Sequence, residues 1–144
     1  MKIEDIMKEW KNDAKIDDIN LDSSSIDIPI LHAKWLEIRT KAKSKLIGLQ
    51  YKKKKLTKTL YEYYRGNLNN PDDLKEINRE PLLNKPLNSE TTIYVDADEE
   101  MIHLNLRIAA QEEIVDVLTE ILKSINNRNW VIKAAVDYRK LTHT

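Results

Sequence analysis

The sequence contains no cysteine and no phenylalanine, and it has only two glycines and four prolines among its 144 residues. Without cysteine, the chain can form no disulfide and offers no thiolate as a metal ligand or nucleophile. The shortage of glycine and proline argues against a β-sandwich or a barrel, because such folds need many tight turns. No run of 18 apolar residues is present, and the first ten residues are charged throughout. We therefore expect a soluble protein without a membrane span or a signal peptide.

The length fits one domain with a modest core, because hydrophobic residues make up 41% of the chain and aromatic residues only 6%. The formal net charge is zero, but the charges are segregated along the chain. Ten cations and one acid lie between residues 34 and 58, whereas residues 1–27 and 96–120 each contain eight acids. Such segregation indicates a charged partner more strongly than a total charge does.

Hydrophobic periodicity predicts an all-α fold. A short amphipathic helix is expected over residues 3–15, and a polar linker over residues 17–27. Apolar residues in steps of three and four predict one helix from Ile28 to Tyr64, about 55 Å long, with Gly66 as its stop signal. A helix of this length cannot be covered by the rest of a small domain, so we expect it to pack against other copies of the chain.

The second half is expected to hold a Pro/Asn-rich loop over residues 66–92, a short extended piece over residues 91–95 and a helix that ends near Asn126. The acids of residues 96–98 would cap this helix. A short C-terminal helix would follow the break at residues 126–129. The expected division, within one domain overall, is an N-terminal region 1–65 that binds DNA, a loop or mobile segment 66–95 and an oligomerisation region 96–144. A heptad seam is expected to join subunits through Met101, Leu104, Ile108, Val115, Leu118, Leu122 and Ile125.

The lysines of the long helix form the candidate binding site. At 100° per residue, several of them form a ladder along one side, which begins at Lys34, and Gly48 lies within the same arc. Lys53 projects into the apolar stripe, and burying its ammonium without a partner would be costly. We therefore expect the apolar face to open around Lys53. The expected nucleic-acid-binding residues are Lys41, Lys43, Lys45, Lys52, Lys53, Lys54, Lys55, Lys58 and Arg65.

Four tyrosines, at positions 51, 61, 63 and 64, accompany these cations. Cations that follow a phosphate backbone, together with rings on which bases stack, make a sequence-tolerant surface for single-stranded nucleic acid. No base-reading motif is present, so binding should be non-specific and sensitive to salt. Three other interpretations stay open: a solvated helix face, a helix that pairs with acidic segments in a structural or adaptor protein, and an anionic membrane surface.

No catalytic chemistry is expected from these residues. The sequence has no glycine-rich phosphate loop, and His32, His103 and His143 have no second ligand at metal-binding spacing. The acids of residues 98–100 fit the first turn of a helix better than a metal site or an acid/base pair. We expect no cofactor, no metal and no enzyme activity.

Four short segments, in this order and spacing, resemble the UvsY family of recombination mediators of T-even-like bacteriophages: Met1-Lys2-Ile3-Glu4-Asp5, Lys34-Trp35-Leu36, Glu62-Tyr63-Tyr64 before Gly66, and Val131-Ile132-Lys133. The likeness spans nearly the whole chain. It implies a ring-like homo-oligomer, of six or seven subunits, that binds single-stranded DNA in the cytoplasm of the infected bacterial host. Such proteins weaken the hold of the phage single-strand-binding protein and help to load the UvsX recombinase.

The family's Leu-Lys-Ala-Arg-Leu DNA-binding motif aligns with residues 57–61, which read Thr-Lys-Thr-Leu-Tyr here. Only Lys58 keeps a charge of the motif, because Leu60 stands in place of its arginine. The resemblance therefore assigns a DNA contact to Lys58 alone, and the lysines at 52–55 would supply the missing charge.

Overall fold

The computed structural model describes residues 1–143, and these residues contain helices and no strand. The expected all-α fold is confirmed. The elements are α1 (Ile3–Asp13), α2 (Leu21–Ile26), α3 (Ile28–Tyr64), α4 (Pro71–Glu76), a 3-10 turn η1 (Asn88–Glu90), α5 (Thr91–Ala97) and α6 (Glu99–Thr142). The predicted oligomerisation region ends at Thr144, which lies outside the described residues.

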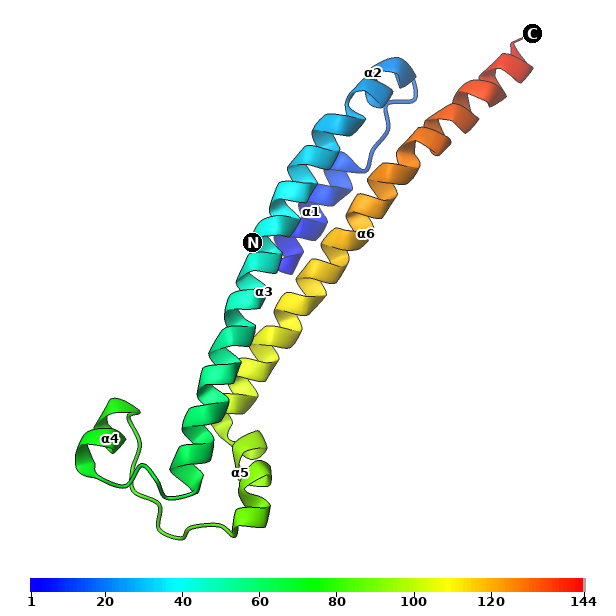
Figure 1. The fold of residues 1–144 in the computed structure, drawn as a ribbon. Coiled ribbons are helices and arrows are strands. Elements are labelled where there is room, and N and C mark those ends of the chain that lie inside the picture. The colour runs from blue at the N-terminus through cyan, green and yellow to red at the C-terminus, as the bar shows by residue number, and fades with distance from the viewer. Residues whose placement is uncertain (144) are drawn as a thin grey trace. The chain divides into compact units, whose positions relative to one another are not determined.

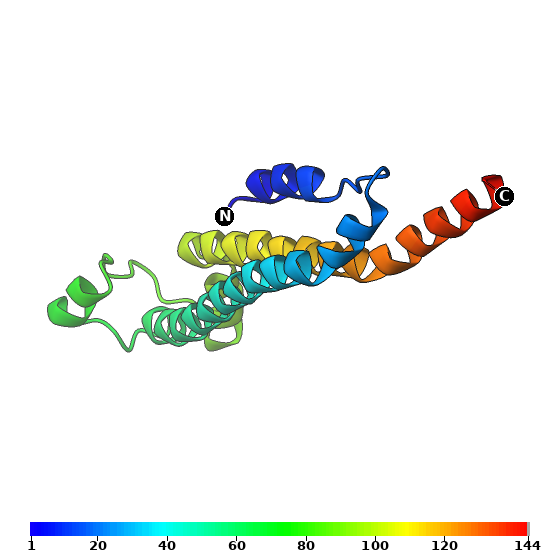
Figure 2. The same cartoon turned by 90° about the horizontal axis from the view of Figure 1, so that it is seen from above.

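The chain forms two compact units, and the two long helices contribute to both. Unit 1 comprises Met1–Ser44 and Gln111–Thr144, and unit 2 comprises Lys45–Ala110. In unit 1, α1 runs antiparallel to the first part of α3 and lies beside α6 (Figure 1, Figure 2). The core of this unit consists of Ile6, Leu21, Ile28, Trp35, Leu118, Ile121, Ile125 and Ile132.

Polar contacts fix the helices of unit 1 to one another. The carboxylate of Asp13, at the end of α1, accepts hydrogen bonds from the Lys34 ammonium at 2.6 Å and from the Trp35 indole at 3.0 Å. The buried side chain of Gln111 donates to the Ala42 carbonyl over 2.9 Å. Gln111 lies between Ile108 and Val115 of the predicted seam, at the same helical spacing, and this bond gives its buried amide a partner.

Unit 2 packs α5 against the end of α3 and the start of α6. Its central contact is made by Leu60, Val95 and Met101, one residue from each of these helices. The predicted end of α3 is confirmed: Gly66 has a φ of 80°, its amide donates to the Tyr63 carbonyl, and the next amide reaches Glu62. This is a Schellman cap, in which glycine adopts the left-handed conformation at little cost.

Three expectations about local structure were wrong. The polar linker holds α2, because Leu21 and Ser24, one turn apart, are both buried. The segment 66–95 contains α4, η1 and α5. Residues 91–95 are helical instead of extended, because Thr91 and Val95 lie four residues apart and both are buried. Tertiary packing has overruled the preference of β-branched residues for strands.

The predicted break at residues 126–129 is absent, and α6 continues to Thr142 without a separate C-terminal helix. Asparagine costs a helix only a few tenths of a kcal/mol relative to better helix formers. Here that cost is offset by the burial of Ile125, Arg128 and Ile132, which recur at helical spacing. The guanidinium of Arg128 donates to the Asp13 carbonyl over 2.7 Å and thereby fixes the end of α1 to α6.

Candidate nucleic-acid interface

The unit 2 part of α3 separates an apolar face from a cationic one. Leu46, Leu49 and Leu60 are buried, whereas the cations of residues 45–65 lie in the exposed positions between them. These 21 residues contain seven cations and a single acid, Glu62, whose carboxylate is bonded to Asn67. The helix therefore presents a strongly positive surface, which suits a polyanion.

Every predicted binding residue is exposed: Lys41, Lys43, Lys45, Lys52, Lys53, Lys54, Lys55, Lys58 and Arg65. Lys41 and Lys43 belong to unit 1 and the others to unit 2. Lys53 is exposed despite its place between the apolar positions Leu49 and Leu56. This exposure leaves the ammonium hydrated and removes the cost of burying it.

Few of these cations are neutralised. Within the described part of the chain, Lys41 is the only one of the nine with an ion pair, to Glu37 at 3.1 Å. Both partners are well exposed, and such pairs contribute little. The ammonium of Lys54 lies 5.1 Å from the centre of the Tyr51 ring, and the guanidinium of Arg65 lies 5.2 Å from that of Tyr61. These cation–π contacts leave the positive charge available.

The expectation that the lysine ladder begins at Lys34 was wrong. Its ammonium is paired with Glu9 at 2.8 Å and with Asp13 at 2.6 Å, both on α1. The hydrogen bonds that this ammonium donates to Asp13 and then to Glu9 raise the pKa of Lys34. A lysine held by two carboxylates is not a phosphate contact, and the role of Lys34 is to fix α1 to α3.

The four tyrosines differ sharply in their surroundings. Tyr63 is buried, and its hydroxyl donates to the Glu80 carbonyl over 2.6 Å. The hydroxyl of Tyr64 donates to the Asp98 carboxylate over 2.6 Å, and that of Tyr61 is 2.8 Å from the Thr92 hydroxyl. Tyr51 alone of the four is exposed. Three of the predicted stacking rings are therefore tied into the packing of unit 2.

The residues aligned with the family's DNA-binding motif have different environments. Lys58 is exposed and available to a phosphate, whereas Leu60 is 1% exposed and lies at the centre of the unit 2 core. The position that carries an arginine in the motif is thus a packing position in this chain.

The predicted subunit seam is largely covered within the chain itself. Of its seven members, all but Leu122 are buried, and Leu122 is half-buried. A second apolar strip of α6 consists of Ile102, Leu106, Ala110, Ile114, Val117 and Ile121. It is more open at its start, since Ile102 and Leu106 are exposed and therefore more accessible to a neighbouring copy than the seam is.

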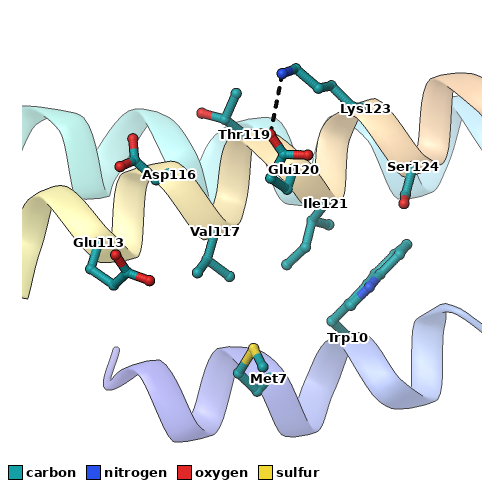
Figure 3. Close-up of a pocket in the computed structure, with 10 residues that line it drawn as sticks. All are labelled: Met7, Trp10, Glu113, Asp116, Val117, Thr119, Glu120, Ile121, Lys123 and Ser124. Atoms are coloured by element: carbon teal, nitrogen blue, oxygen red, sulfur yellow. Dashed lines mark hydrogen bonds and ion pairs between the residues drawn. The ribbon is translucent and has the colours of Figure 1, made fainter.

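A groove between α1 and α6 in unit 1, of about 660 Å3, differs in character from the cationic surface. Met7 and Trp10 project into it from α1, facing Val117 and Ile121 of α6 (Figure 3). Glu113, Asp116 and Glu120 line it with one cation, Lys123, which is paired with Glu120 at 3.2 Å. Its net negative charge repels phosphate, so this groove is no nucleic-acid site.

Unit 2 contains an ionic cluster around the buried Asp98 that the sequence did not predict. The guanidinium of Arg79 donates to Asp98 and to Glu100, while Tyr64 donates to Asp98. Asp98 was predicted as a cap, and its carboxylate does accept from the Glu100 amide at the start of α6. Its pairing with Arg79, which follows the left-handed residue Asn78, could not be foreseen. The cluster satisfies its own charges and holds residues 66–98 in place.

Among residues 1–143, no group of three or more histidine or acidic side chains could hold a metal ion. No helix in this part of the chain is long and apolar enough to span a bilayer.

Comparison with known proteins confirms the resemblance. The solved structures of the phage T4 recombination mediator protein UvsY have the same fold: one matches with a TM-score of 0.85 at 24% identity, covering 100% of this chain and 99% of that one. A second, from another crystal lattice, gives 0.83 at 22% identity and 99% coverage of both chains. The recombination protein UvsY of Enterobacteria phage T4 is 24% identical over 139 residues, 96% of each sequence. The family model for the recombination, repair and ssDNA-binding protein UvsY matches residues 9–143, and this chain therefore belongs to the UvsY family.

Proposed function

We propose that this chain is a recombination mediator that grips single-stranded DNA with the exposed cations of α3. The observation that carries the proposal is that all nine of these cations are exposed, seven of them in unit 2, and that Lys41 alone has an ion pair within residues 1–143. Membership of a family described by ssDNA binding supports nucleic acid as the polyanion. Lysine charges contact phosphates without reading bases, so the binding is independent of sequence.

The proposed action follows from the resemblance. The chain binds the strand, weakens the coat of the phage single-strand-binding protein and helps to load a UvsX-like recombinase, without catalysing a reaction, in the host cytoplasm. A mediator needs to hold a strand at many weak points, and a homo-oligomeric ring of six or seven subunits supplies them. Repeating a weak site converts modest contacts into tight binding through effective concentration.

Assembly is proposed to involve α6. Because the seam side chains are largely buried within the subunit, they position the helix, and the exposed Ile102 and Leu106 are among the apolar groups of α6 available to a neighbour. The mass of the native particle tests this part. A monomer at micromolar concentration would contradict the ring.

The binding proposal is tested by titrating a fluorescent (dT)20 oligonucleotide at several salt concentrations. If about five phosphates are neutralised per subunit, log K falls against log salt with a slope near −3.5. Replacing Lys52, Lys53, Lys54 and Lys55 with alanine should reduce that slope by about 3 and weaken binding strongly. The matched control replaces the exposed Lys2, Lys8, Lys11 and Lys15 with alanine, which changes the net charge equally. Equal losses in the two variants, or no binding by the natural chain at low salt, would refute the proposal.

The rival interpretation, a helical adaptor whose lysine helix pairs with acidic protein segments, gives the opposite result in the same titration. It predicts no binding of the oligonucleotide at low salt.

A further inference from the structure

Tyr51 is an exposed aromatic ring inside the cationic stretch of α3, and packing gives no reason for it. Its side chain is 61% exposed, and Lys52, Lys53, Lys54 and Lys55 follow it directly. The other three tyrosines of this stretch use their hydroxyls in hydrogen bonds within unit 2. Single exposed apolar side chains are common on protein surfaces, so exposure alone assigns Tyr51 no role. What sets this ring apart is its place directly before four exposed lysines, where a base and its phosphate could be bound together.

The ring of Tyr51 is accompanied by a cation. The ammonium of Lys54 lies 5.1 Å from the ring centre and therefore covers one face of it. The opposite face is then the one on which a flat ligand would stack. A cation held beside the ring can meet the phosphate of the nucleotide whose base stacks there, so charge and stacking act on one nucleotide.

Gly48 lies one turn before Tyr51 on nearly the same side of α3, and helical side chains lean toward the N-terminus, which is the direction of Gly48. A Cβ atom at Gly48 would meet no atom within 4 Å, and its backbone has no positive φ. Neither packing nor backbone geometry thus requires a glycine in the middle of this helix. Its absent side chain leaves a shelf of open helix surface one turn before Tyr51.

We infer that Tyr51 and the shelf at Gly48 receive an unpaired base, and that this contact gives the protein its preference for single strands over duplex. The lysines cannot supply such a preference, because both kinds of DNA carry phosphates. A base in a duplex is stacked on its neighbours and paired, so its face is not available to a tyrosine. This inference rests on the proposed function, since it assigns a second kind of contact to the same site.

The test uses the full-length chain and three labelled probes of equal length: (dT)20, a 20-nucleotide abasic oligonucleotide with the same phosphates, and a 20-base-pair duplex. The natural chain should bind (dT)20 roughly tenfold more tightly than the abasic strand. Tyr51→Ala should remove that difference and leave the affinity for the abasic strand and the duplex unchanged. Tyr51→Phe should behave like the natural chain, because stacking needs the ring and not the hydroxyl.

Two further variants separate stacking from other effects. Tyr138→Ala removes a ring that is 68% exposed on α6, outside the lysine stretch, and should change nothing. Gly48→Leu places a bulky side chain on the shelf with a residue that favours helix, and should weaken (dT)20 binding only, whereas Gly48→Ala should weaken it less.

The outcomes are distinct. If Tyr51→Ala binds (dT)20 as tightly as the natural chain while the four-lysine variant loses affinity, the role of Tyr51 is refuted and the proposed function stands. If the natural chain binds none of the three probes, the proposed function itself fails. Equal loss by Tyr51→Ala on all three probes would also overturn the stacking role, because it would indicate a general effect on the site.

Discussion

The guanidinium of Arg79 and the carboxylate of Asp98 form a bidentate ion pair, with nitrogen–oxygen distances of 2.5 and 2.9 Å. Asp98 is almost fully buried, with 4% of its side chain exposed, and Arg79 has 18% exposed. The pair joins the segment after α4 to the start of α6. Because a buried charge requires its partner, this contact should be important to the stability of unit 2.

Removing the cation should therefore destabilise the protein strongly. Arg79→Ala leaves the Asp98 carboxylate buried without its main partner, and we expect the free energy of unfolding to fall by about 3 kcal/mol. Urea denaturation followed by circular dichroism measures this change. The control is Lys123→Ala, which breaks an exposed pair on α6 and should cost less than about 1 kcal/mol. Similar losses in the two variants would contradict a structural role for the buried pair.

Acid should weaken the same contact. Burial alone would raise the pKa of Asp98, but the hydrogen bonds from Arg79 and Tyr64 outweigh it and lower the pKa to about 2. A carboxyl group whose pKa is lower in the folded state contributes stability above its unfolded pKa, near 4, and loses it as the pH falls toward 2. The loss should be on the order of 2 kcal/mol. Unfolding by urea at pH 6, 4, 3 and 2 measures it, and the decline should be smaller in Asp98→Asn.

High pH should lower the stability of the folded protein through ionisation of Tyr64. Burial and then the hydrogen bond to Asp98 raise its pKa to about 12, so the folded state prefers the neutral phenol. A group with a raised pKa contributes stability below its unfolded pKa, near 10, and loses it as the pH rises from 10 to 12. Tyr64→Phe cannot ionise and should lose less stability across this window. A natural chain whose stability falls no more than that of Tyr64→Phe would contradict the assignment.

Arg128 offers a separate test in unit 1. Its buried guanidinium donates to the backbone carbonyls of Asp13 and Lys15, and burial lowers its pKa. Arg128→Ala removes these bonds and leaves two carbonyls short of a donor, so we expect a loss of about 2 kcal/mol. Hydrogen exchange should increase most at the end of α1. Asn127→Ala, one residue away and exposed, should leave the exchange of α1 unchanged.

Periodicity predicted the elements that are long and regular. The bounds of α3 and its stop at Gly66 follow from apolar steps of three and four and from one glycine. The elements that were missed are set by distant contacts. Thr91 and Val95 are helical because both side chains are buried within unit 2. Helix α6 continues through residues 126–129, because Arg128 is hydrogen-bonded to the end of α1. Local propensity cannot report such contacts.

The candidate site shows the same limit. That its lysines are exposed could be predicted, because nearly all of them fall outside the apolar stripe. Lys34 looked identical to them in sequence, yet its partners Glu9 and Asp13 lie more than 20 residues earlier. Helical phase, by contrast, does separate two of the tyrosines: Tyr63 follows Leu60 by three residues and is buried, whereas Tyr51 follows Leu49 by two and is exposed.

Leu60, which is buried, occupies the position at which the family motif carries an arginine. Restoring the motif's arginine with Leu60→Arg would place a guanidinium against the buried Val95 and Met101. The carboxylate of Asp98, which lies between these two residues in the sequence, is already paired with Arg79. The cost of an unpaired buried charge should exceed about 3 kcal/mol, so the variant should unfold at lower urea and bind DNA no better than the natural chain. Gln50→Arg adds the same charge at an exposed position of α3 and should keep stability within about 0.5 kcal/mol. It should also strengthen binding of (dT)20 modestly, because one more phosphate can be neutralised. A stable Leu60→Arg protein with tighter DNA binding would show that this position can turn outward, and would return the DNA-binding role to the motif itself.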